Sequence, residues 1–275
     1  MVTIAEKPGP ARRPHHHGVG LLLRDWRRRR RLSQMELALE AGVSTRHLSF
    51  VETGRSRPSA EMVLHLAERL DVPLRERNEL LLAAGFAPQY SARDFDDPAL
   101  REVRDAVSRV LAAHEPYPAI AVDRYWNLVA SNEALGPFLD GVAPELLVPP
   151  VNTIRLALHP DGVAPRILNL GEYRADLVDR LDRAARLTGD PLLAELHEEM
   201  LGYPGPELGG RDQSHVDPAV TVGLQLAPAP GSDAPQLSFF STITTFGTAV
   251  DVTVSELAVE AFFPADAQTA DYLRG

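Results

Sequence analysis

Polar and basic side chains gather between residues 44 and 57, and their chemistry matches the base edges and phosphates of a DNA duplex. An arginine such as Arg46 can donate two parallel hydrogen bonds to O6 and N7 of guanine. Arginines in a loop, such as Arg55 and Arg57, can hold backbone phosphates. Phe50 has two interpretations, because it either meets a thymine methyl or packs against its own chain. We expect the remaining contacts as follows: Thr45 and Ser49 to bases, and His47 to phosphate or water.

These side chains need a helix that presents them outward, and the flanking residues predict one. Ser33, followed by Glu36, has the spacing of a capping box at the start of a first helix. Gly42 is suited to end that helix in the left-handed conformation, and Ser44 can cap a second helix. The free N–H groups at the two helix starts, near Gln34 and Ser44, favour phosphate.

The same stretch resembles the helix-turn-helix of the phage-repressor-like family. The resemblance covers about forty residues and rests on several positions that agree in spacing: Gln34, Leu37-Ala38, Gly42-Val43-Ser44, Leu48, Glu52, Gly54 and Pro58. It implies that Arg27, in the preceding helix, pairs with Glu52 in a largely buried ion pair that orients the two helices. The alternative is an ordinary helical hairpin.

The distribution of charge favours a DNA-binding head joined to a different kind of domain. The net charge of the chain is −10, which alone argues against a nucleic-acid partner. Residues 1–90, however, hold 15 Lys and Arg against 10 Asp and Glu, whereas residues 91–275 hold 13 against 28. A basic head on an acidic body is the layout expected of such a two-part protein.

Several classes of protein are disfavoured. The chain has no cysteine, no apolar run of 18 residues and no apolar segment near its start, so we expect a cytoplasmic protein without disulfides, membrane spans or a secretory signal. None of the GxSxG, HExxH, P-loop or GxGxxG motifs occurs, so we expect neither an enzyme nor a cofactor. His15, His16 and His17 lie in a Pro-rich stretch and lack the fixed geometry of a metal site.

The chain divides into a tail and two domains. We expect a disordered tail at 1–18, a five-helix head at 19–88 and an α+β domain at 97–266. In the second domain, an amphipathic helix at 97–114 precedes strands at 119–123 and 126–131, a helix capped by Ser131 or Asn132, a strand at 152–159 and a long helix at 165–187. A further helix at 191–201 and strands at 220–226, 237–246 and 256–263 complete an antiparallel sheet. The strand–turn–strand–helix order at its start resembles PAS-type sensor domains.

The order of sequence blocks from residue 19 onward resembles the MmyB-like regulators of actinobacteria. The blocks are RHLSFVETGRSRPS, NELLLAAGFAP, RYWNLVASNEAL and NTIRLALHPDG, followed by a β-rich third. The resemblance implies a repressor-like head joined to a PAS-like domain that binds a fatty-acid-type or other apolar carboxylate ligand.

A site for such a ligand needs an apolar interior and a polar anchor. Arg155, among apolar neighbours in a predicted strand, is the first candidate for a carboxylate anchor, and the alternative is a surface or internally paired arginine. Further polar contacts are expected from one face of the long helix, and an apolar wall from an aromatic residue: Arg166, Asn169, Tyr173 and Trp126.

The sequence therefore predicts a DNA-binding transcription regulator controlled by a small apolar ligand. Specific binding by such heads normally uses two half-sites, so we expect a homodimer. The helix at 97–114 either forms the dimer interface or packs inside its own domain. The alternative function is an antitoxin-type or ligand-independent repressor, in which the second domain serves dimerisation or protein partners.

Overall fold

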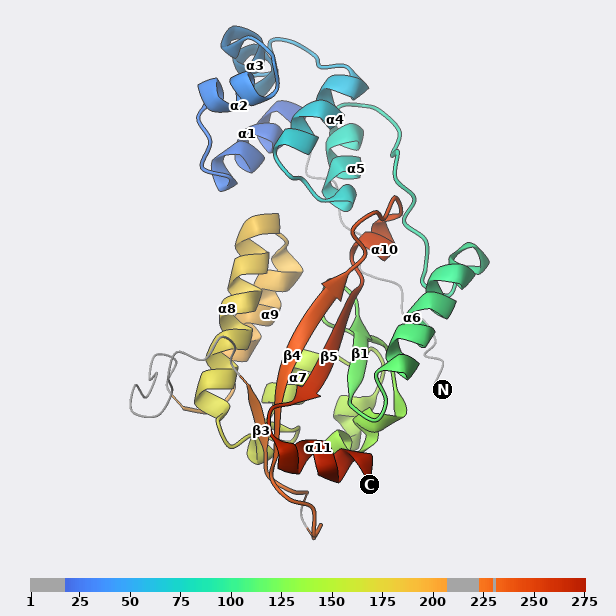
Figure 1. Ribbon diagram of the computed structural model, residues 1–275. Helices are drawn as coiled ribbons and strands as arrows, with labels where there is room; N and C mark the ends of the chain where they lie inside the picture. The colour runs from blue at the N-terminus through green and yellow to red at the C-terminus, as the bar shows by residue number, and fades with distance from the viewer. Residues whose placement is uncertain (1–17, 207–222, 230) are drawn as a thin grey trace.

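The computed structural model describes residues 18–206, 223–229 and 231–275, so the predicted tail with its three histidines lies outside the described residues. The first part is a helical head, drawn in blue to cyan in Figure 1. Its helices share one apolar core that includes Leu23, Trp26, Leu48 and Leu66. The helices are α1 (Val19–Arg29), α2 (Gln34–Glu40), α3 (Thr45–Glu52), α4 (Ala60–Arg69) and α5 (Leu74–Ala83).

Local chemistry fixes the pair α2–α3. The Ser33 hydroxyl accepts the Glu36 N–H at 3.1 Å, and the Glu36 carboxylate accepts the Ser33 N–H at 2.7 Å, so the predicted capping box is confirmed. Gly42 ends the turn with a φ of 63°, a conformation that side chains rarely adopt. At the crossing of α1 and α3, a Cβ on Gly20 would lie 2.2 Å from the Val51 carbonyl oxygen, so the two backbones approach as closely as they do because residue 20 is glycine.

The second part is built on a five-stranded antiparallel sheet with the order β2-β1-β5-β4-β3. Its strands are β1 (Ala119–Val122), β2 (Leu128–Ser131), β3 (Leu224–Leu226), β4 (Leu237–Thr245) and β5 (Ala258–Pro264). The α+β fold predicted from the sequence is therefore confirmed. The predicted strand at 237–246 corresponds to β4, an interior strand next to the middle strand β5.

Helices cover both faces of the sheet (Figure 1). On one face, α6 (Arg101–Ala113), preceded by the short helix η1 (Pro98–Leu100), buries Val107 and Leu111 against β1 and β5. This packing accounts for the apolar face of α6 without a second copy of the chain. The other face is covered by α7 (Thr153–Leu158), α8 (Leu170–Thr188) and α9 (Pro191–Gly202), with the short helices η2 (Glu133–Leu139), η3 (Pro144–Leu147) and η4 (Ala164–Arg166). Two further helices, α10 (Val252–Ser255) and α11 (Ala267–Arg274), lie between β4 and β5 and at the C-terminus.

Three predicted elements are wrong in type or extent. Residues 153–158 form α7 rather than a strand, because the Asn152 side chain caps a helical turn by accepting the Arg155 N–H. The long helix begins at Leu170 instead of residue 165, and Arg166 belongs to the separate short helix η4. The helix after Asn132 is a 3₁₀-helix with Pro137 inside it, and the Asn132 side chain does not cap it because that side chain bonds the backbone of residues 117 and 119.

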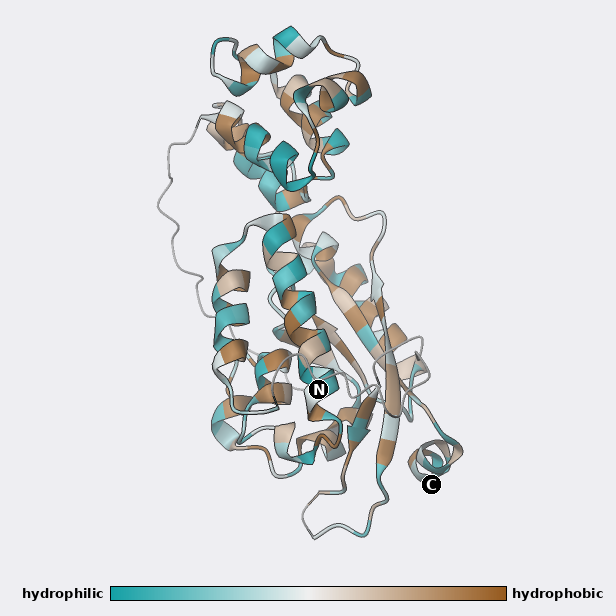
Figure 2. Ribbon diagram, turned by 90° about the vertical axis from the view of Figure 1, so that its left-hand side faces the viewer, coloured by the Kyte–Doolittle hydropathy of each residue, from teal (hydrophilic) through white to brown (hydrophobic). Residues whose placement is uncertain are grey.

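Head and body touch where α5 meets α10 (Figure 1). The segment between the two domains is held there as well, because Ser91 accepts the Val252 N–H at 2.7 Å. Figure 2 shows brown, apolar residues lining the sheet and the inner sides of its helices. Within the described ranges, no helix combines the length and the apolar character that a membrane span requires.

Candidate DNA-binding surface and ligand cavity

Helix α3 presents a polar face to solvent. Ser44, Thr45 and Arg46 are exposed, and His47 and Ser49 are half-buried. The Ser44 hydroxyl accepts the His47 N–H at 3.1 Å and thereby caps the helix. The first turn of α3 is thus open to a partner, as a helix that enters a major groove requires.

Phe50 positions two of the predicted DNA-contacting arginines. The Arg46 guanidinium lies 5.3 Å from the centroid of the Phe50 ring, and that of Arg55 lies 5.9 Å away. Both distances fit cation–π contacts, which hold the charged groups close to the outer face of α3. The half-buried Phe50 ring therefore supports the guanidinium groups of both Arg46 and Arg55.

Arg27 and Glu52 form a buried ion pair between α1 and α3. The bonds from Arg27 Nε and Nη2 to the two Glu52 oxygens are 2.6 and 2.8 Å long, and the side chains are 10% and 1% exposed. Gln34 adds a 2.8 Å bond from Nε2 to Glu52. Burial alone raises the pKa of Glu52, but the bonds from Arg27 and Gln34 bring it below its ordinary value.

Arg57 has a structural bond as well as an exposed position. Its Nη2 donates to the Ala84 carbonyl at 3.1 Å, at the end of α5. The loop after α3 is therefore held to the last helix of the head, while Arg57 stays on the surface as a phosphate contact would require.

A cavity of about 80 Å³ lies between the sheet and the helices on its inner face. This volume is about half that of the roughly 150 Å³ apolar cavity that takes up benzene. The lining is mainly apolar, and its polar members are Thr153, Tyr173 and Glu260. The principal apolar members are Ile120, Trp126, Leu128, Phe138, Leu156, Val163, Leu177, Leu224 and Phe262.

The structure separates the five predicted ligand contacts. Trp126 and Tyr173 line the cavity. Arg155 does not, because it lies on α7 and donates to Glu199 at 2.7–3.0 Å, with a side chain that is 43% exposed. Arg166 donates to the carbonyls of loop residues 137, 138 and 140 and of residue 227. Asn169 bonds the backbone on either side of residue 224, at the start of β3.

Sequence reasoning missed Glu260, the buried acid at the cavity. Glu260 is 7% exposed, and it lies on the same face of β5 as residues 258 and 262, so it points into the apolar core. An acid at an inward position of a strand was a signal that the sequence AVEAFF carried.

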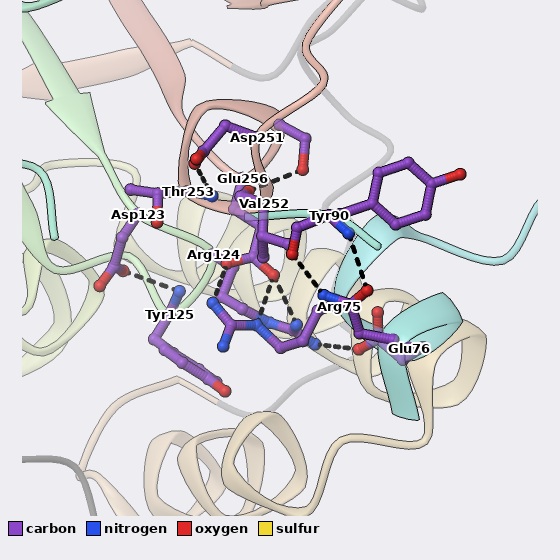
Figure 3. A network of polar contacts seen from close by, with 12 residues as sticks. Arg75, Glu76, Tyr90, Asp123, Arg124, Tyr125, Asp251, Val252, Thr253 and Glu256 are labelled. Carbon is purple, nitrogen blue, oxygen red and sulfur yellow. Dashed lines mark hydrogen bonds and ion pairs between the residues drawn. The ribbon is translucent and has the colours of Figure 1, made fainter. Parts of the chain in front are cut away.

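The contact between head and body centres on Arg124, another residue that sequence reasoning missed (Figure 3). Arg124 follows β1 and is 8% exposed in its side chain. It contacts Glu76 of the head at 2.8 Å, Glu256 after α10 at 2.7 Å and Asp190 before α9 at 2.9 Å. Arg75 of α5 also pairs with Glu256, at 2.6 and 2.7 Å.

This network is electrostatically uneven. Burial lowers the pKa of Arg124, but the charge of Glu76 and its other partners raise it above its ordinary value. Burial raises the pKa of Glu76, and the Glu76 Oε2 atom has no hydrogen-bond partner among the described residues. The buried charge of Glu76 is therefore stabilised mainly by Arg124.

The turn that carries Arg124 also carries Trp126. Trp126 has a φ of 64°, an uncommon conformation for a non-glycine residue. The turn is held by Asp123, which accepts the Tyr125 and Asn127 N–H groups at 2.8 and 2.9 Å. Thr153 bonds the Trp126 carbonyl through both its N–H and its hydroxyl, at 2.8 and 3.0 Å.

A helix-turn-helix head and a body with an apolar cavity define a DNA-binding regulator that responds to a ligand. In comparisons with protein families, the MmyB-like transcription regulator ligand binding domain matches residues 103–275, and a helix-turn-helix family matches residues 23–77. The first match covers more than half of the chain, so the chain belongs to the MmyB-like transcription regulators. Both families are regulatory, and they imply DNA and a small molecule as partners. A comparison with curated proteins gave no match.

Proposed function

We propose that this regulator changes its affinity for a DNA operator when an apolar small molecule with a fatty-acid-like chain enters the cavity of the body. The observation that carries the proposal is that three cavity-lining segments also contact the head. Such continuity gives a ligand a physical route to bias the position of the head.

The first of these segments is the β1–β2 turn. Trp126 lines the cavity, and Arg124, two residues earlier, pairs with Glu76 of α5. A shift of the turn by a ligand at Trp126 moves the guanidinium that holds the head.

The other two segments are β5 and α8. Glu260 lines the cavity, and Glu256, four residues earlier, bonds Arg75 of the head. Helix α8 contributes Tyr173 and Leu177 to the cavity, and its last carbonyl, on Thr188, accepts Arg29 of α1 at 2.8 Å. A cation at a helix C-terminus is favourable, so this contact also links the body to the head.

We further propose that the functional unit is a homodimer. One α3 face offers few base contacts, and dimers of such heads bind half-sites about 34–36 Å apart. In that arrangement a small rotation of each head changes the distance between the two α3 helices, so the operator fits one state better than the other. We expect sedimentation of the full chain to show a dimer and the DNA footprint to have two-fold symmetry. A monomer that protects a single half-site would contradict the proposed homodimer.

The test of ligand control begins with the operator, selected from random DNA with the full chain. Operator affinity is then measured at one fixed salt concentration, with and without saturating hexanoate and hexan-1-ol. We expect at least one of them to change affinity tenfold or more, which corresponds to about 1.4 kcal/mol of coupling. If neither compound changes operator affinity or the melting temperature, this ligand class is wrong. Arg155→Met, which alters an ion pair away from the cavity and the head, is the matched control and keeps the wild-type response.

A further inference from the structure

The polar part of the cavity is acidic. Glu260 lies on the middle strand of the sheet, among apolar side chains, and its Oε1 accepts the Ser241 hydroxyl at 2.7 Å. Among the described residues that line the cavity, none is basic. A ligand's polar end therefore meets a buried carboxylate.

The arginines near the cavity do not line it. Arg155 pairs with Glu199, and Arg166 donates to backbone carbonyls. Arg180 donates to Asp176 at 2.8 Å and stacks on Trp126 at 5.4 Å, and its Nη1 lies 3.9 Å from Glu260, too far for a hydrogen bond. That Nη1 is buried without a hydrogen-bond partner among the described residues, and Arg180 is not among the residues that line the cavity.

The hydroxyl of Thr153 is also committed as a donor, because it gives its proton to the Trp126 carbonyl. Thr153 can therefore only accept a bond from a ligand. The Tyr173 hydroxyl can donate or accept. All three of these polar groups, Glu260 included, thus have spare capacity to accept a hydrogen bond.

We propose that the ligand of this cavity carries a hydrogen-bond donor, a hydroxyl or an amine, at its polar end, and that Glu260 accepts that bond. The proposal rests on the proposed function and narrows it: a fatty-acid-like chain matches the apolar lining, whereas a carboxylate head would lie against Glu260. The Arg180 cation, 3.9 Å from Glu260, does not line the cavity and already faces that acid. Two like charges in one buried site strongly disfavour joint ionisation. A donor head group instead gains a charge-assisted bond to the carboxylate.

The environment of Glu260 agrees with this assignment. Burial raises the pKa of Glu260 above its ordinary value, although the bond from the Ser241 hydroxyl and the charge of Arg180 act in the opposite direction. A cationic or neutral donor lowers the free-energy cost of the buried Glu260 charge, and a second anion raises that cost. Burial likewise raises the pKa of Tyr173, so its hydroxyl stays protonated.

Calorimetric titration of the full chain at pH 8 with hexylamine, hexan-1-ol and hexanoate tests the proposal. The three probes share one short apolar chain and differ in the head group. We expect hexylamine and hexan-1-ol to bind at least tenfold more tightly than hexanoate. In Glu260→Gln, the affinity for hexylamine should fall at least tenfold and the affinity for hexanoate should rise at least fivefold. The affinity for hexan-1-ol should change less than threefold.

The control is Glu199→Gln, which makes the same chemical change outside the cavity and should leave the three affinities unaltered. The Glu260→Gln chain should fold, because burial already disfavours the charged form, and its melting temperature without ligand checks this. If hexanoate binds most tightly to the wild type, or if Glu260→Gln leaves the order of the probes unchanged, the head-group assignment is overturned and ligand control of DNA binding can still hold. If none of the probes binds, the cavity is not the ligand site and both proposals fail.

Discussion

Replacing Arg124 by methionine should loosen the head from the body and weaken the response of DNA binding to ligand. Methionine keeps much of the apolar volume of arginine and removes the charge and the hydrogen bonds. In the variant, Glu76, Asp190 and Glu256 lose a shared cation in a region where their side chains are 3–13% exposed.

The expected loss in the free energy of unfolding is that of one unpaired buried carboxylate rather than three. Glu256 keeps its pair with Arg75, and Asp190 keeps the Tyr125 hydroxyl and the Leu192 N–H. Glu76 has no comparable second partner among the side chains described. Removing one member of a buried ion pair costs about 3–5 kcal/mol, and the cost is bounded because the head can separate and let Glu76 reach water.

Thermal unfolding at pH 8 and pH 5 measures this effect. For a chain of this size the loss corresponds to a fall of about 6–20 °C in melting temperature, or to a split into separate transitions of head and body. The folded-state pKa of Glu76 is already raised, and losing Arg124 raises it further. Stability tied to a raised acid pKa is present at low pH and lost as pH rises through the folded pKa, so the variant should lose less at pH 5 than at pH 8.

The double variant Arg124→Met/Glu76→Gln removes the stranded charge and should recover at least half of the loss at pH 8. In either variant, a ligand that fills the cavity should still raise the melting temperature of the body while changing operator affinity less than in the wild type. An equal loss at both pH values, or no loss at all, would refute the account of Arg124 as the buried link between the domains.

Further predictions concern the head and the pH response. Arg46→Ala should lose about 1–3 kcal/mol on the preferred operator and relax its preference at one base pair in a random-DNA selection, and an equal loss on all sequences would make Arg46 a phosphate contact. Arg57→Ala should weaken all sequences alike and flatten the salt dependence by about one unit in a salt titration; an unchanged slope would leave its bond to Ala84 as its whole role. Arg27→Met strands Glu52 and should cost the head about 3–5 kcal/mol in denaturant unfolding, whereas a loss below 1 kcal/mol would contradict a buried pair. The lowered pKa of Glu52 gives the head stability that is lost as pH falls through the folded pKa, and the raised pKa of Glu260 gives the body stability that is lost as pH rises, so the two unfolding transitions should respond to pH in opposite directions in calorimetric scans.

The helices of the head could be predicted from the sequence because capping residues and glycines close in the chain define where they begin and end. The capping box at Ser33, the left-handed Gly42 and the cap at Ser44 each involve residues only a few positions apart. The pairing of Arg27 with Glu52 spans 25 positions, and resemblance to a known family of heads suggested it.

The cavity was less predictable because its polar groups come together through tertiary packing. Arg155 was placed in a strand from its apolar neighbours, but the cap at Asn152 makes the segment helical, and a partner 44 positions away, Glu199, determines where its guanidinium lies. Arg124 gave no local sign of its role, since its partners in the head and the body lie 48 and 132 positions away.

The turn from Asp123 to Asn127 has a consequence for engineering. It is five residues long, it holds Trp126 in an uncommon backbone conformation, and it carries both the cavity contact and the contact with the head. On the proposed coupling, a library confined to these positions would retune how strongly a biosensor built from this chain responds, leaving the exposed face of α3 and most of the cavity lining intact. On the same proposal, a foreign head grafted onto this body needs an acid that can meet Arg124, as Glu76 does, before a ligand in the cavity can act on its DNA.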